Sequence, residues 1–174
     1  PIPNCFDKVL DIDKCYLQAD PSNDIREATR RFCIENGYSF HNCREHAGLM
    51  RNIIIRTAST GEIMVIVIFN EADMERISAL MNYLQSEFEQ ITSLFYVVNT
   101  KWNDSVGDLE HILWSGKDHI IEQMEGLQFK VGPKSFYQTN SEQAYELYKV
   151  AREFADLQGD EVLYDLYTGT GTIA

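Results

Sequence analysis

Apolar residues recur at helical spacing in one early segment of the chain, residues 22–36. They fall three and four positions apart, which is typical of a helix that buries one face. The apolar residues on this face are Ile25, Ala28, Phe32 and Cys33. Ser22 or Asn23 is suited to cap the helix at its start, and Gly37 is suited to end it in the left-handed conformation. The pattern therefore predicts a first helix over residues 22–36.

Two strand-like segments follow, and a short turn separates them. Residues 49–57 and 63–69 are rich in Ile and Val, and residues 58–61 between them read Ala-Ser-Thr-Gly, which predicts a β-hairpin. Residues 71–89 then return to helical spacing, and residues 91–99 form a third strand-like run. We expect the three strands to share one antiparallel sheet that has both helices on one face.

The next segment is first polar and then strand-like again. Residues 99–107 form a polar loop with Trp102, which can either stack on a nucleic-acid base or pack against the domain. Short strands are predicted at residues 111–114 and 120–124. The Glu-Gly pair that comes next predicts a tight turn into a further strand over residues 127–131.

The last forty residues carry a different pattern. A helix is predicted over residues 141–157, with Asn140 or Ser141 as its cap and Gly159 after its end. Its expected buried face consists of Ala144, Leu147, Tyr148, Ala151 and Phe154. Residues 161–166 read as an apolar strand that leads into a glycine-rich loop. A strand, a glycine loop and a helix in this order begin a doubly wound nucleotide-binding domain.

The chain therefore divides near residue 132 into two parts of different character. Residues 1–131 are predicted to form an α+β central domain, an antiparallel sheet with helices, which can dock RNA. Residues 132–174 are predicted to be the truncated start of a Rossmann-like α/β domain. Because the sequence stops inside the glycine-rich loop and opens without Met, we expect it to be a piece of a longer protein.

Composition and charge restrict the function. The 174 residues carry 15 Lys plus Arg and 27 Asp plus Glu, a net charge of −12, which argues against a free-standing nucleic-acid binder. We expect this chain by itself to bind RNA weakly and with little sequence preference. No apolar run approaches the roughly 18 residues that span a bilayer. No secretory signal is present, so the sequence predicts a cytoplasmic protein without a membrane partner or an obligate protein partner.

The cysteines and histidines predict no metal site. The four cysteines are Cys5, Cys15, Cys33 and Cys43. The residues that come nearest to a ligand group are Cys33, His41, Cys43 and His46. Their spacing matches no standard zinc pattern, so the thiols are interpreted as buried or incidental. His111 and His119 have no acidic partner at a recognisable spacing and are expected to be structural.

The glycine-rich loop, residues 163–171, is the most informative stretch. An acidic residue at the end of a strand, followed by small residues and Gly-x-Gly, lets the backbone approach a ligand closely. Asp165 stands directly before the loop, which favours S-adenosylmethionine, because an NAD site places its acidic residue about 20 residues later. A tight turn without a ligand is the alternative.

A second motif precedes this loop by about 30 residues and reads Ser-Phe-Tyr-Gln-Thr-Asn over residues 135–140. Followed by Asp-Leu-Tyr-Thr-Gly-Thr-Gly over residues 165–171, it resembles the RNA uracil-5-methyltransferases, which form 5-methyluridine. The resemblance covers essentially the whole chain, including residues 48–56. Cys15 resembles the position of the fourth cysteine of an iron–sulfur cluster in some members, but the other three are absent, so no cluster is expected.

The resemblance implies that both motifs bind the cofactor S-adenosylmethionine. Gln138 matches the glutamine that hydrogen-bonds it, and Tyr167 matches an aromatic position beside it. The residues that match the loop around its amino acid end are Asp165, Gly169, Gly171 and, where many members have Asn, Thr172.

For the substrate, Phe136 matches an aromatic residue that lies against the flipped target uracil. Lys134 beside it is a candidate for binding RNA phosphate. Arg51 and Arg56 lie on a predicted strand, where each can either contact RNA phosphate or be solvated.

The resemblance also implies the reaction, in which a cysteine adds to C6 of uracil and C5 then accepts the methyl group. The family's catalytic cysteine and base lie beyond residue 174, so this chain alone is expected to be inactive. The expected substrate is ribosomal or transfer RNA, in particular 23S ribosomal RNA. Another class of S-adenosylmethionine-dependent methyltransferase and a non-enzymatic RNA-docking module are the alternatives.

Overall fold

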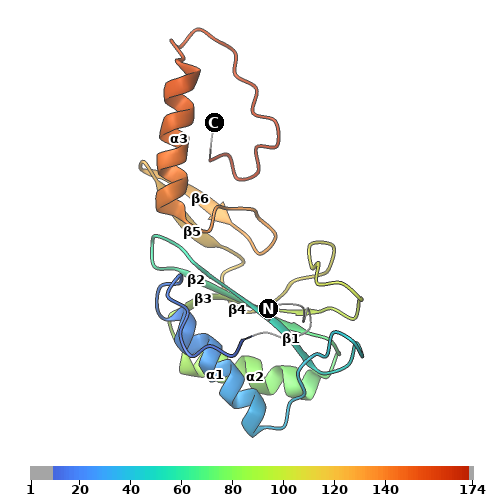
Figure 1. The fold of residues 1–174 in the computed structure, drawn as a ribbon. Helices are drawn as coiled ribbons and strands as arrows, with labels where there is room; N and C mark the ends of the chain where they lie inside the picture. Colours follow the sequence, from blue (N-terminus) through green and yellow to red (C-terminus); the bar gives the residue numbers. More distant parts are fainter. Residues whose placement is uncertain (1–9, 173–174) are drawn as a thin grey trace.

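A four-stranded sheet forms the centre of the computed structural model, which describes residues 10–172 (Figure 1). The elements, in chain order, are α1 (Ser22–Glu35), β1 (Met50–Thr57), β2 (Ile63–Phe69), α2 (Met74–Glu87), β3 (Ile91–Val98), β4 (Ile112–Gly116), β5 (Ile120–Met124), β6 (Leu127–Val131) and α3 (Ser141–Ala155). β1 to β4 make the sheet, and β5 with β6 makes a separate hairpin. Each element predicted before residue 132 is present within a few residues of its expected bounds.

The sheet is mixed, so the prediction of an all-antiparallel sheet is wrong at one pair. The order is β1-β2-β3-β4, with antiparallel pairs at both sides and a parallel pair between β2 and β3. Helix α2 connects these two strands and returns the chain to the end of the sheet where β2 began, so β3 runs in the same direction as β2. A strand, a helix and a strand in succession form a parallel crossover unit.

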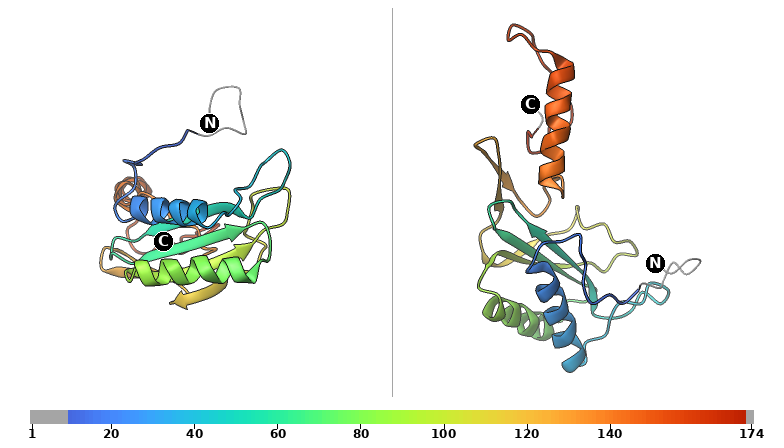
Figure 2. Two further views of the ribbon diagram at one scale, coloured as in Figure 1. Left: turned by 90° about the horizontal axis from the view of Figure 1, so that it is seen from below. Right: turned by 60° about the vertical axis from the view of Figure 1, so that its left-hand side comes forward.

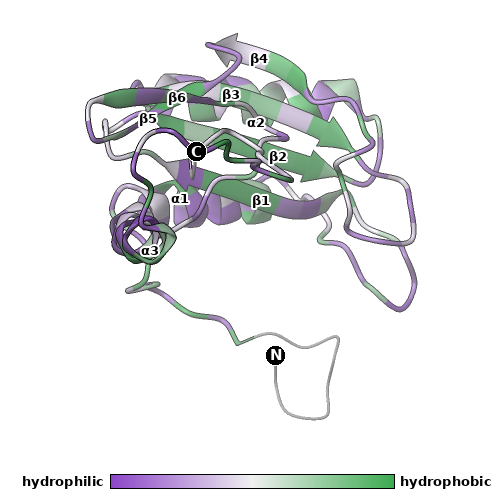
Figure 3. Cartoon of the chain, turned by 90° about the horizontal axis from the view of Figure 1, so that it is seen from above, coloured by the Kyte–Doolittle hydropathy of each residue, from purple (hydrophilic) through white to green (hydrophobic). Residues whose placement is uncertain are grey.

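Strand β2 is buried along its whole length because both faces of the sheet are covered. Helices α1 and α2 lie side by side on one face, as predicted (Figure 2). The side chains of β2 in that first core are Ile63, Val65, Val67 and Phe69. The side chains of β2 in the second core, on the opposite face, are Met64, Ile66 and Ile68. Hydrophobic colour accordingly runs along β2 and β3, while the loops around the sheet are mostly hydrophilic (Figure 3).

The hairpin of β5 and β6 covers part of the second face of the sheet. Ile120 and Val131, at its open end, pack in the second core. Its tight turn lies at Glu125 and Gly126, as predicted, with φ of 50° and 80°. Glu122 is buried and ties the hairpin to its surroundings: its carboxylate accepts hydrogen bonds from the backbone N–H of Ser59 at 2.9 Å and from Ser141 Oγ at 3.0 Å.

The start of α1 differs from the prediction. Pro21 occupies the cap position, and no side chain caps the helix. Asn23, which was expected to cap it, instead exchanges two hydrogen bonds with the backbone of Cys15, at 2.8 and 3.1 Å. Gly37 follows the helix with φ of 67°, the left-handed conformation predicted for it.

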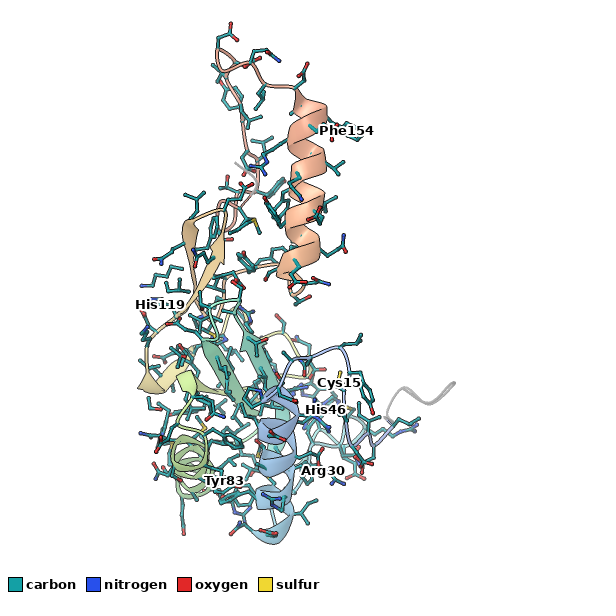
Figure 4. All side chains as sticks on the ribbon, turned by 90° about the vertical axis from the view of Figure 1, so that its left-hand side faces the viewer. Cys15, Arg30, His46, Tyr83, His119 and Phe154 are labelled. Atoms are coloured by element: carbon teal, nitrogen blue, oxygen red, sulfur yellow. The ribbon has the colours of Figure 1, made fainter. Side chains whose placement is uncertain are left out.

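Helix α3 stands away from the sheet and leaves most of its apolar face uncovered (Figures 1 and 2). Asn140 caps it as predicted, accepting from the backbone N–H of Gln143 at 3.0 Å. Of the face expected to be buried, Ala144 and Tyr148 are buried, whereas Leu147, Ala151 and Phe154 are exposed. Phe154 projects from the end of the helix that is farther from the sheet (Figure 4).

The strand predicted over residues 161–166 is absent, because that segment is irregular and mostly exposed. A strand needs a neighbour for its backbone hydrogen bonds, and none of the described strands lies beside it. The end of α3 also differs from the prediction, since Asp156 rather than Gly159 takes the left-handed position that ends the helix. The Rossmann-like organisation of residues 132–174 therefore stays a prediction.

Candidate functional site

The site begins with a turn after the hairpin, at Gly132–Ser135. The backbone N–H of Ser135 donates to the carbonyl of Gly132 at 3.1 Å, and Ser135 Oγ accepts from the backbone N–H of Gly132 at 3.1 Å. Arg56 of β1 reaches this turn, and its Nη1 donates to the carbonyl oxygen of Ser135 at 2.9 Å and to that of Gly132 at 3.3 Å. The turn is therefore held both by its own bonds and by the sheet. Lys134 is exposed within it.

The two aromatic residues after this turn differ in their surroundings. Phe136 is 72% exposed. Tyr137 packs against the second core, and its ring centroid is 6.2 Å from that of Phe129. Burial, and then the nearby charge of Glu122, raise the pKa of Tyr137 to about 12. Tyr137 thus anchors the segment to the sheet, whereas Phe136 is displayed to solvent.

Gln138 lies where this segment enters α3, beside an open pocket of about 440 Å³. The pocket is lined by Gln138, Thr139 and Asn140, and by residues of α3 that include Gln143 and Leu147. Its wall is mainly apolar, and Gln138 adds an amide that can both donate and accept a hydrogen bond.

The glycine-rich loop is a series of tight turns. Thr168 Oγ1 donates to the carbonyl of Asp165 at 2.8 Å, and the backbone N–H of Gly171 donates to the carbonyl of Thr168 at 2.8 Å. Gly169 and Gly171 have φ of 59° and 77°, values that glycine adopts without strain. Tyr167 is fully exposed. Asp165 Oδ2 is buried and receives no hydrogen bond from the described residues.

The structure brings the two motifs together although they begin about 30 residues apart in the sequence. Thr170 Oγ1 donates to the carbonyl of Phe136 at 3.5 Å. Thr172 Oγ1 donates to the hydroxyl of Tyr148, on α3, at 3.3 Å. The glycine-rich loop therefore lies against the segment that displays Phe136. Within the described residues, no hydrogen bond joins Gln138 to this loop.

Arg51 lies apart from this site, at the other end of β1. Its Nη1 donates to the carbonyls of Asn99 and Lys101 at 2.7 and 2.6 Å. Its Nη2 donates to the carbonyl of Asn103 at 2.9 Å, and both Nη2 and Nε donate to Asp104 Oδ1. All five N–H donors of the guanidinium are thus used inside the chain. Arg51 holds the loop after β3, and the donors that a phosphate contact would need are engaged.

Trp102, in this same loop, is 80% exposed rather than packed into the domain. Its ring centroid is 4.0 Å from that of His46. Cys33 lies in the first core, where burial raises the pKa of its thiol to about 12. Over residues 10–172, no group of three potential ligand side chains is placed to hold a metal ion.

In the same described part of the chain, no helix has the length and apolar character that a membrane crossing requires.

Comparison with known proteins shows extensive similarity to RNA methyltransferases. No family model matches the chain. A protein described as an uncharacterized RNA methyltransferase from Bacteroides thetaiotaomicron is 59% identical over 176 residues, covering 99% of this chain and 39% of its own length. One with the same description from Porphyromonas gingivalis is 56% identical over 175 residues, covering 99% of this chain and 38% of its own length.

A solved structure is similar across nearly the whole chain. The Pyrococcus abyssi tRNA (uracil-54, C5)-methyltransferase in complex with S-adenosyl-L-homocysteine has a TM-score of 0.77 and 28% identity, and covers 98% of this chain and 40% of that one. The resemblance indicated by the two motifs is thereby confirmed. The chain spans about two fifths of the length of the curated relatives it matches.

Proposed function

From this similarity to RNA methyltransferases, we propose that the protein containing this chain transfers the methyl group of S-adenosylmethionine to C5 of a uridine in RNA. The observation that carries the proposal is the pairing of the two motifs, residues 135–140 and 165–171, which lie in contact through Thr170 and Phe136. The similar solved structure, a uracil-C5 methyltransferase, supports uridine C5 as the target.

The glycine-rich loop has features that fit the amino acid end of S-adenosylmethionine. The buried Oδ2 of Asp165 has no described partner, so it can accept a hydrogen bond from the cofactor's ammonium group. A Cβ added at Gly169 or Gly171 would meet its nearest heavy atom at 3.8 Å, an ordinary contact, so no other segment packs tightly on the backbone there and a ligand can approach it. Thr172, on the same loop, would complete this group of contacts.

The remaining cofactor residues, Gln138 and Tyr167, would bind the rest of the molecule. Gln138 offers a donor and an acceptor at the edge of the pocket beside α3. Tyr167 presents an exposed ring that can cover an apolar surface of the cofactor. When bound, S-adenosylmethionine supplies the electrophilic methyl group.

Phe136 would hold the target base. A flipped base leaves its stack and needs a new apolar face, and the exposed ring of Phe136 beside the glycine-rich loop can provide one. Lys134, two residues earlier and exposed, can contact RNA phosphate. Cys33 is not a candidate for the thiol that attacks C6, because its thiol is buried in the first core and its pKa is raised to about 12.

The proposal is tested by methyl transfer in the full-length protein. Purified protein is incubated with S-adenosylmethionine carrying a labelled methyl group and, separately, with unmodified ribosomal RNA and transfer RNA. Digestion of the RNA to nucleosides should yield labelled 5-methyluridine from one of the two. Label found only in another nucleoside would indicate a different class of methyltransferase, and RNA binding without any transfer would indicate a docking module.

Calorimetry tests the cofactor residues separately. Gln138→Ala should weaken S-adenosylmethionine binding by about 1–3 kcal/mol, the cost of losing a buried hydrogen bond. Gln128→Ala, at an exposed position on β6, is the matched control and should leave the affinity unchanged. Unchanged affinity in Gln138→Ala would remove Gln138 from the cofactor site.

A further inference from the structure

Strand β1 carries two arginines whose environments differ. Arg51 has every donor satisfied, including an ion pair with Asp104 at 3.0 Å. Arg56 is half-buried, and the structure gives it only two partners, the carbonyl oxygens of Gly132 and Ser135. Both bonds come from Nη1, so Nε and Nη2 have no bond to the described residues. Its charge has no carboxylate partner among these residues, and a partly buried charge without a counter-charge is costly.

The charged groups around Arg56 do not neutralise it. Lys134 is exposed in the turn that Arg56 holds, and it forms no ion pair within the described part of the chain. His111 lies close enough for the charges of both Lys134 and Arg56 to lower its pKa, in addition to the larger effect of its burial. Asp108 is close enough for Lys134 to act on it, but Asp108 is already paired with Lys101 at 2.5 Å.

These groups lie next to the proposed position of the target base. Arg56 donates to the carbonyl of Ser135, the residue directly before the exposed Phe136. His111 donates from Nδ1 to the carbonyl of Leu109, 3.2 Å away, so its Nε2 can donate to a phosphate only when the ring is protonated. The cluster therefore consists of two cationic side chains with unused donors, Arg56 and Lys134, beside an exposed aromatic ring.

We propose that Arg56 and Lys134 form a binding site for one phosphate group of the RNA backbone beside Phe136. The proposal rests on the proposed function and extends it from the base to the backbone. A guanidinium and an ammonium bind phosphate oxygens through charge-assisted hydrogen bonds, and such contacts fix the position of a nucleic acid without reading its sequence. The bound phosphate would also supply the negative charge that Arg56 lacks.

The site has a positioning role as well. Because Arg56 bonds to the turn that carries Lys134 and leads into Phe136, binding of phosphate at its free donors would connect the RNA backbone to the sheet. The nucleotide would then be held at its phosphate by Arg56 and Lys134, and at its base by Phe136.

The test measures RNA binding by the full-length protein as a function of salt, with a single-stranded oligouridylate of twelve nucleotides as the probe. Lys134→Gln and Arg56→Gln should each weaken binding about tenfold, the loss expected of one charged contact. Each should also lower the slope of log affinity against log salt by about one. Lys130→Gln removes the same charge from an exposed position on β6 and should lower the slope by clearly less.

A purely structural role of Arg56 would give a different result. Arg56→Lys keeps the charge, so it should keep most of the salt slope, and thermal unfolding confirms that each variant is folded. Inorganic phosphate should shift the ring signals of His111 in the wild-type NMR spectrum and shift them less in Arg56→Gln. Salt slopes that stay at the wild-type value in both Lys134→Gln and Arg56→Gln would overturn the proposal.

The outcomes also separate this inference from the proposed function, because binding and methyl transfer are measured independently. Protein that forms 5-methyluridine while the two variants keep the wild-type salt slope contradicts only the phosphate site. Protein whose slopes fall as expected but which methylates another position contradicts only the choice of uridine C5.

Discussion

Glu122 shows how one buried residue joins parts of the chain that are distant in sequence. It lies on β5, and its carboxylate accepts hydrogen bonds from Ser59 in the β1–β2 turn and from Ser141 at the start of α3. The hairpin, the sheet and the last helix therefore meet at a single side chain. The side chain of Glu122 is buried, so its removal loses several hydrogen bonds at once.

Glu122→Ala should therefore lower the free energy of unfolding by about 1–3 kcal/mol, because Ser59 and Ser141 both lose their acceptor. Urea unfolding followed by circular dichroism measures the change. Gln123→Ala, at the exposed neighbouring position, is the control and should change stability by less than about 0.5 kcal/mol. Equal stability of the two variants would contradict this role of Glu122.

The sequence predicted which residues belong to the site better than it predicted the surroundings of each side chain. The motif that contains Phe136 and Tyr137 can be recognised in the sequence, but only the structure distinguishes the exposed ring of Phe136 from the partly buried ring of Tyr137. Arg51 and Arg56 are equivalent in the sequence, as arginines on one strand. Their roles separate because loop carbonyls and Asp104 surround the first, while the second meets only two carbonyls. Such long-range partners leave no local pattern.

At the scale of elements, the end of β4 depends on a close approach of two backbones. Gly116 has φ of 80°, and a Cβ added there would lie 2.1 Å from the carbonyl oxygen of Thr92. Gly126, in the β5–β6 turn, also has φ of 80° but has open space around it. The two glycines thus share a backbone conformation and differ only in their neighbours.

Alanine at these two positions separates backbone strain from collision. Gly126→Ala should cost about 1–2 kcal/mol, the penalty of the left-handed conformation alone. Gly116→Ala should cost roughly 1–3 kcal/mol more, because the carbonyl of Thr92 must move. Chemical denaturation of both variants measures the two losses of stability. Equal losses would mean that β3 and β4 can move apart at this point without cost.

The contact between the β5–β6 turn and α3 is predicted to depend on pH. Hydrogen bonds from Arg152 and then from Tyr145 lower the pKa of Glu125 from 4.5 to about 2. A lowered pKa in the folded state means that the contact stabilises the fold above about pH 4.5 and loses this effect as the pH falls towards 2. The NMR signals of Tyr145 should shift over this pH range, as its hydroxyl loses the hydrogen bond to Glu125.

Glu125→Gln should abolish this dependence, since the amide does not titrate. Glu146→Gln removes a carboxylate that pairs within α3, with Lys149 at 2.7 Å, and should leave the Tyr145 transition in place. A Tyr145 transition that persists in Glu125→Gln would show that another group controls it.

The hydrophobic pattern predicted the elements of the first part of the chain better than their arrangement. Periodicity locates β2, α2 and β3, because burial on one face or two imposes it on each element separately. The parallel direction of β3 depends on where α2 returns the chain, which periodicity does not encode. The strand predicted over residues 161–166 is apolar but has no partner strand in the described chain, so its pattern alone does not make it a strand.

For the whole molecule, the described chain combines a covered sheet with a helix, α3, that leaves most of its apolar residues exposed. The chain carries a net charge of −12 and spans about two fifths of the length of its relatives. Cys33 is buried in the first core, and Cys15 and Cys43 lie outside the two motifs. Cys5 lies outside the described residues.

The isolated 174-residue chain should therefore transfer no methyl group to RNA. Labelled S-adenosylmethionine and uridine-containing RNA are incubated with this chain, and in parallel with the full-length protein as the positive control. Label that appears at C5 of uracil with the short chain, and disappears when all four cysteines are changed to Ser, would contradict the prediction.

The burial of β2 on both faces also sets the order in which backbone amides exchange with deuterated water. Its amides lie between β1 and β3 and under two cores, so they exchange only when both cores open. Amides of α3 need only local fraying of a helix that stands away from the sheet. The slowest protons of the protein should consequently belong to a segment that ends long before either motif, and a proteolytic fragment that stops near residue 131 should retain them.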